Sequence, residues 1–299
     1  MLDREQLETF ATIVELQSFE RAAGALRITR GAVSQRIKTL EQSLAAVLLV
    51  RDKPVVATPA GDTLLRHVQA LRMLEGSILR ELGRAAGAGA GAGAGEPVPM
   101  AVSVNADSLA TWFRGVLWAL LRERGVALEV IVDDLDHTAA RLARGQVVGC
   151  VSSDATPASG FAAQPLGEME YRCYASPSFA DEFFVGGLAL PAVLAVPTVL
   201  FDRKDSLHDR YLTQCFGFAV DRYPRHYLPS PNALMEAIEE GVGYGLLPSR
   251  QAASRVADGL LVELAPHLAV PVPLYWHHWA FEPPLCKALT KLIVEFARA

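Results

Sequence analysis

The chain has 299 residues, 51% of them apolar, and a formal net charge of −5. This length favours about two domains of ~150 residues each, and the acidic balance argues against nucleic-acid binding over the whole surface. The four cysteines are far apart in the sequence and form no metal-type pair, so we expect reduced thiols and no metal site.

Residues 1–5 do not start a basic segment followed by an apolar run, so we expect no secretory signal. The most apolar stretch, Val185 to Phe201, is broken by Pro191 and Pro197, whereas a membrane span needs ~20 unbroken apolar residues. We interpret this stretch as buried strand and loop, and expect a cytoplasmic protein without membrane contact.

Residues 3–44 have the apolar period of three helices. Asp3 can cap the first helix, Ser18 begins a short second one, and Thr29 can cap the third. The buried face of the third helix is formed by Val33, Ile37, Leu40 and Leu44. A β-like ribbon over 47–57 follows, which predicts a winged helix-turn-helix.

Thr58 and Pro59 predict the start of a long helix, because Thr is a good N-cap and Pro suits the first turn. Apolar residues along it repeat at coiled-coil spacing, which predicts a dimer seam. The seam residues are Leu64, Val68, Leu71, Ile78 and Leu82.

An Ala/Gly tract from Ala85 to Gly95, followed by Glu96 and Pro97, predicts a flexible hinge over 85–97. It separates a DNA-binding domain (1–58) and a linker helix (59–84) from a second domain (98–299). The second domain alternates strands with helices, which favours an α/β fold with a mainly parallel sheet. We expect two lobes around a cleft, lobe I at about 98–167 and 267–299 and lobe II at about 168–266.

Charge is concentrated in the first domain. Between Ser18 and Lys53 there are seven basic and three acidic side chains, whereas residues 83–299 carry 17 basic and 23 acidic ones. In a helix-turn-helix the second helix of the motif lies in the major groove, where Gln pairs with adenine and Arg or Lys with guanine. The expected DNA-binding residues are Ser18, Arg21, Thr29, Arg30, Ser34, Gln35, Arg36, Lys38, Arg51 and Lys53. This pattern alone is also compatible with an ordinary helical hairpin whose polar face is only solvated.

An ordered series of motifs runs through residues 1–82. It comprises Ser-Phe-Glu-Arg-Ala-Ala at 18–23, Ala-Val-Ser-Gln-Arg-Ile at 32–37, Leu-Glu at 40–41, Leu-Leu-Val-Arg at 48–51 and Thr-Pro-Ala-Gly at 58–61. This series resembles the N-terminal domain of LysR-type transcription regulators. The resemblance implies promoter DNA and RNA polymerase as partners, a homodimer or homotetramer built through the linker helix, and a sensor domain resembling periplasmic binding proteins.

Residues 103–112, 145–149 (Gly-Gln-Val-Val-Gly) and 275–277 (Tyr-Trp-His) resemble the ArgP/LysG branch of that family. The resemblance implies a lysine or arginine effector and control of a basic amino-acid exporter gene. Two positions depart from the family pattern. Ala45-Ala46 stands where a glycine usually ends the recognition helix, and Arg30-Gly31 replaces a more usual polar or Pro-Ser pair.

Ligands of open α/β sheets bind beyond the carboxyl ends of strands. Residues 105–108 follow the first expected strand and begin a helix, whose N–H groups suit a carboxylate, and aspartates at other strand ends suit a cation. The expected effector-binding residues are Asn105, Asp107, Ser108, Asp133, Ser152, Asp202 and Asn232. The alternative is that Asp107 and Ser108 only cap a helix and that the other aspartates are solvated.

Three other functions are alternatives to this one. A regulator of this family that responds to another small molecule stays open. Residues 97–299 alone could be a solute-binding protein, but the DNA module argues against it. The sequence has no Gly-x-Ser-x-Gly motif, no phosphate-binding Gly-rich loop and no metal-spaced His/Cys cluster, so we expect no catalytic residues, no cofactor and no enzyme.

Overall fold

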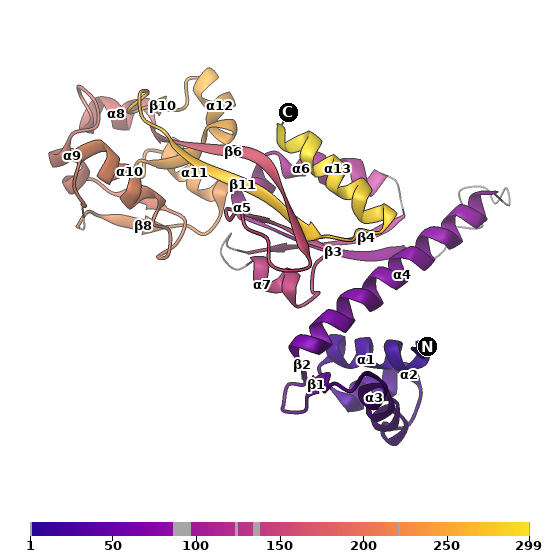
Figure 1. Ribbon diagram of the computed structural model, residues 1–299. Coiled ribbons are helices and arrows are strands. Elements are labelled where there is room, and N and C mark those ends of the chain that lie inside the picture. The colour runs from indigo at the N-terminus through magenta and orange to yellow at the C-terminus, as the bar shows by residue number, and fades with distance from the viewer. Residues whose placement is uncertain (1, 86–96, 123–124, 134–137, 221, 299) are drawn as a thin grey trace.

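Figure 1 shows the computed structural model, which describes residues 2–85, 97–122, 125–133, 138–220 and 222–298. A small helical domain lies at one end, and the long helix α4 (Pro59–Ala85) connects it to a larger α/β domain. Most of the expected Ala/Gly hinge, 86–96, lies outside the described residues.

The first domain is a winged helix-turn-helix, as predicted. Its elements are α1 (Arg4–Leu16), α2 (Phe19–Leu26), α3 (Arg30–Leu44), β1 (Leu49–Val50) and β2 (Val56–Ala57). Asp3, Ser18 and Thr29 each accept a hydrogen bond from the backbone N–H three residues ahead, at 3.0, 3.3 and 3.1 Å. These caps fix where the helices begin, because they satisfy N–H groups that have no partner inside the helix.

The turn from α3 into the wing keeps a left-handed residue although no glycine is present. Ala45 ends α3 with φ +49° and ψ +35°, and its N–H bonds back to the carbonyl of Gln42. The departure from the family pattern therefore does not change the course of the chain here. Instead, it leaves an alanine in a conformation that costs roughly 1–2 kcal/mol for a residue with a Cβ atom.

The five residues of the predicted dimer seam on α4 fall into a buried group and an exposed group. Thr58 caps the helix, accepting a hydrogen bond from the Gly61 N–H at 3.1 Å. Leu64 and Val68, 8% and 2% exposed, lie in the core of the first domain of the same chain, so they are not available to a partner. The other three seam residues, Leu71, Ile78 and Leu82, are 48%, 54% and 61% exposed.

The second domain is built on a mixed sheet, not the mainly parallel sheet expected. Strands β3 (Val98–Val104), β4 (Val126–Val132) and β5 (Gly149–Ser152) are parallel. The long strands β6 (Phe161–Ala175) and β11 (Val270–Trp279) pair antiparallel with each other, and β11 also pairs with β5. β9 (Gly245–Pro248) and β10 (Val262–Glu263) add to β6 at its far end.

Helices cover this sheet and complete the two lobes seen in Figure 1. The lobe I helices are α5 (Ala106–Ala110), α6 (Phe113–Arg122), α7 (Thr138–Ala143) and α13 (Pro284–Arg298). Lobe II contains α8 (Pro177–Phe183), α9 (Leu190–Ala195), α10 (Leu207–Phe216), α11 (Pro231–Glu239), α12 (Ser249–Ala257) and the parallel pair β7 (Thr198–Leu200) and β8 (Arg225–Tyr227).

Two expectations for these elements were wrong in detail. The helix expected to begin at residues 105–108 is interrupted at Thr111 and consists of two helices, α5 and α6. The apolar stretch from Val185 to Phe201 contains helix α9, with a proline in its first turn, where it is tolerated. Among the described helices, none combines the length and the apolarity that crossing a membrane requires.

Because Ala45 is left-handed, we expect Ala45→Gly to stabilise the first domain by about 1 kcal/mol. The measurement is native-state hydrogen exchange of the full chain, in which amides of α1 and α3 that exchange by global opening should slow about fivefold. Ala46→Gly is the matched control, since Ala46 has no positive φ, and it should not slow exchange. Equal or faster exchange in Ala45→Gly would contradict the assignment of strain.

Candidate functional site

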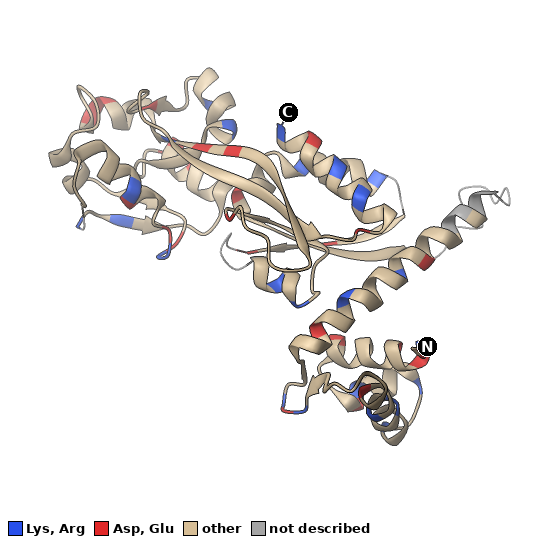
Figure 2. Ribbon diagram, in the orientation of Figure 1, with Lys and Arg blue, Asp and Glu red and all other residues tan. Residues whose placement is uncertain are grey.

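The outer face of α3 carries exposed polar side chains. Arg30, Gln35 and Lys38 are exposed and Ser34 is half-buried, while Val33, Ile37 and Leu40 on the opposite face are fully buried. Figure 2 shows Lys and Arg along α3 and at the tip of the β1–β2 hairpin, at the end of the molecule away from the lobes. The structure therefore places four of the expected DNA-binding residues, Arg30, Ser34, Gln35 and Lys38, away from the buried face of α3.

Other residues expected at DNA have partners within the domain. Arg36 forms an ion pair with Glu5 and donates to Thr9 Oγ1 at 3.3 Å, so it also packs α3 against α1. Arg21 donates to the carbonyl of Leu16, and Arg51 pairs with Glu41 at 3.0 Å. Lys53 is exposed at the tip of the wing, whereas Ser18 and Thr29 serve as helix caps. Phosphate contacts by Arg36 and Arg51 would thus compete with existing pairs.

A cavity of about 500 Å³ lies between the lobes. Four expected effector residues line it: Asn105, Asp107, Asp133 and Asp202. The other three do not. Ser108 is fully buried in the first turns of α5, Ser152 accepts a hydrogen bond from the Asp154 N–H at 3.1 Å, and Asn232 lies beside Gln251 in a separate hollow.

Sequence reasoning missed several residues of the cavity wall, notably Tyr171, Asp205, Arg210 and Gln251. Asp205 follows strand β7, as Asp202 does, and its Oδ1 accepts from the Leu207 N–H at 2.9 Å, so its position before a helix was a usable signal. Tyr171 lies in the middle of β6 and had no local signal. Its hydroxyl donates to Asp107 Oδ2 at 2.5 Å.

The cavity holds two half-buried carboxylates, Asp107 and Asp205. Burial raises the pKa of Asp107, opposed by the Tyr171 hydrogen bond and reinforced by the charge of Asp205. Burial likewise raises the pKa of Asp205, while backbone N–H groups lower it. Among the described residues neither carboxylate forms an ion pair with Lys or Arg, whereas Asp133 accepts from Arg141 Nε at 2.7 Å. A cation entering this cavity would meet two carboxylates, Asp107 and Asp205, that have no ion-pair partner in the described parts of the chain.

Groups suited to an anion lie on the lobe II side. Ser206 precedes α10 and its side chain accepts no hydrogen bond from that helix, while Asp205 Oδ1 accepts from the N–H of Leu207 in the first turn. Arg210, one turn into α10, is exposed and lines the same cavity. A helix N-terminus with an arginine beside it attracts a carboxylate. The cavity therefore complements a ligand that has positive groups and one negative group.

Trp276 and His277 have hydrogen-bond partners within the second domain. Trp276 is fully buried and its indole N–H donates to Thr290 Oγ1 at 2.9 Å, and His277 Nε2 contacts the Asp154 carbonyl at 2.6 Å. All four cysteines are free thiols. Within the described ranges, no group of three His, Cys, Asp or Glu side chains could hold a metal ion.

Comparison with known proteins agrees with this organisation. Residues 4–62 match the bacterial regulatory helix-turn-helix protein family lysR, and residues 98–298 match the LysR substrate binding domain. The HTH-type transcriptional regulator ArgP of Aeromonas salmonicida is 38% identical over 297 residues, 99% of this chain and 97% of that protein.

Two solved structures extend over both domains. The crystal structure of ArgP from Mycobacterium tuberculosis superposes with a TM-score of 0.81 at 36% identity, covering 99% of this chain and 98% of that one. Full-length LysG from Corynebacterium glutamicum with bound effector arginine has a TM-score of 0.79 at 33% identity, with the same coverage. The resemblance to the ArgP/LysG branch is confirmed, and the chain belongs to the LysR family of bacterial transcription regulators.

Proposed function

We propose that this regulator binds promoter DNA through α3 and the wing, and that a basic amino acid, arginine or lysine, in the interlobe cavity modulates this binding. The observation that carries the proposal is the pair of half-buried carboxylates in the cavity, Asp107 and Asp205, without a basic partner among the described residues. The arginine bound to the related LysG supports the same ligand class.

The ligand would bridge the two lobes. Its guanidinium or ammonium group would lie between Asp107 of lobe I and Asp205 of lobe II, and its α-carboxylate would face the N-terminus of α10 and Arg210. Because the two lobes supply different parts of the site, ligand binds more tightly when they approach each other. That differential affinity determines how far the ligand can shift the protein between arrangements.

The wider setting is also part of the proposal. The protein would act in the cytoplasm as a dimer or tetramer, with the exposed side chains of Leu71, Ile78 and Leu82 on α4 contributing to the contact between copies. It would work with RNA polymerase at the promoter of a basic amino-acid exporter gene. The lobes would be divided as expected, with lobe II at about 168–266.

Asp107→Asn and Asp205→Asn should each weaken arginine binding. Removing one charged partner of a buried hydrogen bond costs about 1.5–3 kcal/mol, which is roughly 10- to 150-fold in Kd. Isothermal titration calorimetry with arginine, lysine and the neutral analogue citrulline measures this. Asp181→Asn, an exposed change on α8, is the control. Absence of heat with both arginine and lysine for the unsubstituted protein would refute the ligand class.

Arginine affinity should rise with pH above the ordinary carboxyl value of 3.8. Burial raises the pKa of Asp107 in the empty cavity, and a bound cation lowers it, so the complex holds fewer protons than the free protein. Affinity is therefore weak at low pH and levels off once Asp107 is ionised. Calorimetry from about pH 4.5 to 7.5, in buffers of different ionisation enthalpy, should show proton release. Affinity that falls as pH rises would contradict this.

Gln35→Ala should weaken binding to the operator while leaving nonspecific binding unchanged. A bidentate contact to a base contributes about 1–3 kcal/mol of discrimination, roughly 5- to 150-fold in Kd. Fluorescence anisotropy with the gene's own upstream region, with and without competitor DNA, gives both affinities. Gln42→Ala near the end of α3 is the matched control, because base contacts come from the N-terminal part of the helix. Equal selectivity in both variants would count against the assignment.

A further inference from the structure

Helix α7 lies between the interlobe cavity and the linker helix α4. On the cavity side, α7 contacts Asp133, which lines the cavity and accepts a hydrogen bond from Arg141 Nε at 2.7 Å. Arg141 is on α7, and its Nη1 is also 3.5 Å from Gln146 Oε1. The position of α7 is therefore tied to a carboxylate that a ligand in the cavity would meet.

The other end of α7 is bound to α4. The carbonyl of Ala143, the last residue of α7, accepts a hydrogen bond from Arg66 Nη1 at 2.5 Å. Carbonyls at a helix end have no partner inside the helix, so this arginine caps α7 from another element. Gly145 then turns the chain with φ +67°, and a Cβ atom there would lie 3.1 Å from Arg66 Cγ. The close approach of the two helices thus depends on a glycine.

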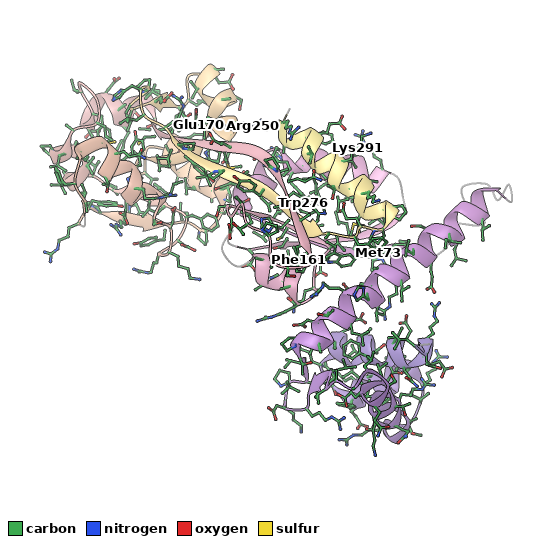
Figure 3. All side chains as sticks on the ribbon, in the orientation of Figure 1. Met73, Phe161, Glu170, Arg250, Trp276 and Lys291 are labelled. Atoms are coloured by element: carbon green, nitrogen blue, oxygen red, sulfur yellow. The ribbon has the colours of Figure 1, made fainter. Side chains whose placement is uncertain are left out.

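Further contacts fix α4 along lobe I. The Arg66 guanidinium lies 5.1 Å from the ring centre of Phe161 on β6. Met73 is buried in the core of the second domain, with its Sδ 3.4 Å from Cys286 Sγ on α13. Figure 3 shows Met73 and Phe161 on the side of lobe I that α4 crosses.

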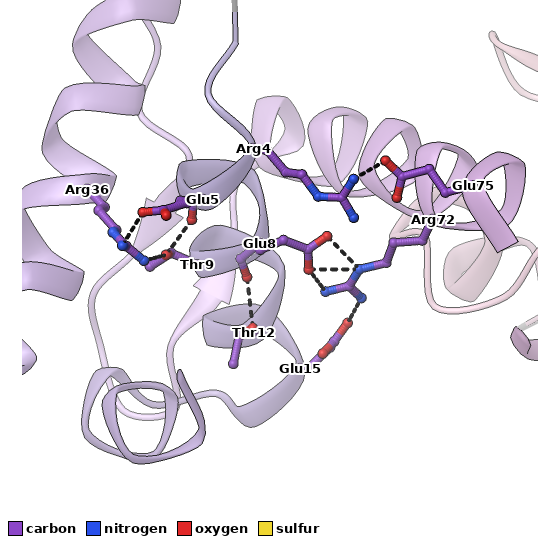
Figure 4. A network of polar contacts seen from close by, with 9 residues as sticks. All are labelled: Arg4, Glu5, Glu8, Thr9, Thr12, Glu15, Arg36, Arg72 and Glu75. Carbon is purple, nitrogen blue, oxygen red and sulfur yellow. Dashed lines mark hydrogen bonds and ion pairs between the residues drawn. The ribbon is translucent and has the colours of Figure 1, made fainter. Parts of the chain in front are cut away.

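Helix α4 is equally bound to the DNA-binding domain, as Figure 4 shows. Arg72 donates to Glu8 at 3.0 Å through Nε and to Glu15 at 2.6 Å through Nη1, and Arg4 pairs with Glu75. Glu8 and Glu15 are on α1, which in turn is linked to the recognition helix through Glu5 and Arg36. A change in how α4 sits on lobe I is therefore transmitted to the DNA-reading surface by charged pairs.

We propose that α7 couples the cavity to the DNA-binding domain, with Arg141 and Arg66 as positioning residues at its two ends. A cationic ligand competes with Arg141 for Asp133, which releases α7 and alters the Ala143–Arg66 contact. The identity of the ligand rests on the function proposed above, but the coupling is a property of the protein alone. It can therefore be tested without any ligand.

The test compares Arg141→Gln, Arg66→Gln and the double variant of the full chain, without amino acid, for operator affinity by anisotropy. Both single changes should alter Kd in the same direction by roughly 2- to 30-fold, and the double variant should not exceed the larger single effect. Arg141→Lys should restore part of the change, because it keeps the charge facing Asp133. Arg122→Gln, an exposed arginine at the end of α6, is the matched control.

Asp133→Asn removes the other half of the same pair and serves as a second variant should Arg141→Gln fold poorly. Additive effects in the double variant, or affinity in Arg141→Gln and Asp133→Asn equal to that of Arg122→Gln, would overturn the coupling. A loss of melting temperature without a change in operator affinity would show a structural role only, and would also overturn it. Arginine calorimetry on the same proteins tests the ligand separately, so the two proposals can fail independently.

Discussion

The pairing of β6 with β11 is the constraint on which the ligand cavity depends. Its register runs from Phe161–Trp279 to Tyr171–Val270, so these strands connect one lobe to the other. Tyr171 and Val272 line the cavity from this ribbon, while the lobes supply the remaining wall. Lobes joined by so few strands can close around a ligand by rotation about the connection.

Carboxylates have three different environments in this protein, and the differences indicate their roles. Glu8 and Glu15 are paired with Arg72, and Asp202 accepts two backbone N–H groups, at 2.7 and 3.0 Å. Asp107 and Asp205, in contrast, are half-buried in the cavity without a basic partner in the described parts of the chain. Burying such groups costs free energy in the empty protein, and a cation that restores the missing partner stabilises the fold when it binds.

The first domain could be predicted closely because its signals are local. Asp3, Ser18 and Thr29 cap helices three residues ahead, and the apolar period identifies the buried face. The cavity could be predicted only in part. Strand ends located Asp107 and Asp202, but that rule does not say which way a side chain points, as Ser152 shows. Tyr171 could not be predicted because long-range pairing of β6 with β11 fixes its position. Pro271 and Pro273 hide the strand pattern of β11 in the sequence. The structure tolerates them because in this part β11 pairs with β6 and not with β5.

The burial of Leu64 and Val68 in the first domain has a consequence for how such regulators can be recombined. A cut at residue 58, where the sequence pattern changes, would remove two side chains from a core that contains Phe10 and Ile37. The smallest independent DNA-reading module therefore includes the first turns of α4. Exchange of sensor domains between relatives, by engineering or in evolution, would preserve both cores only at a junction between Val68 and Met73, because Met73 already belongs to the core of the sensor.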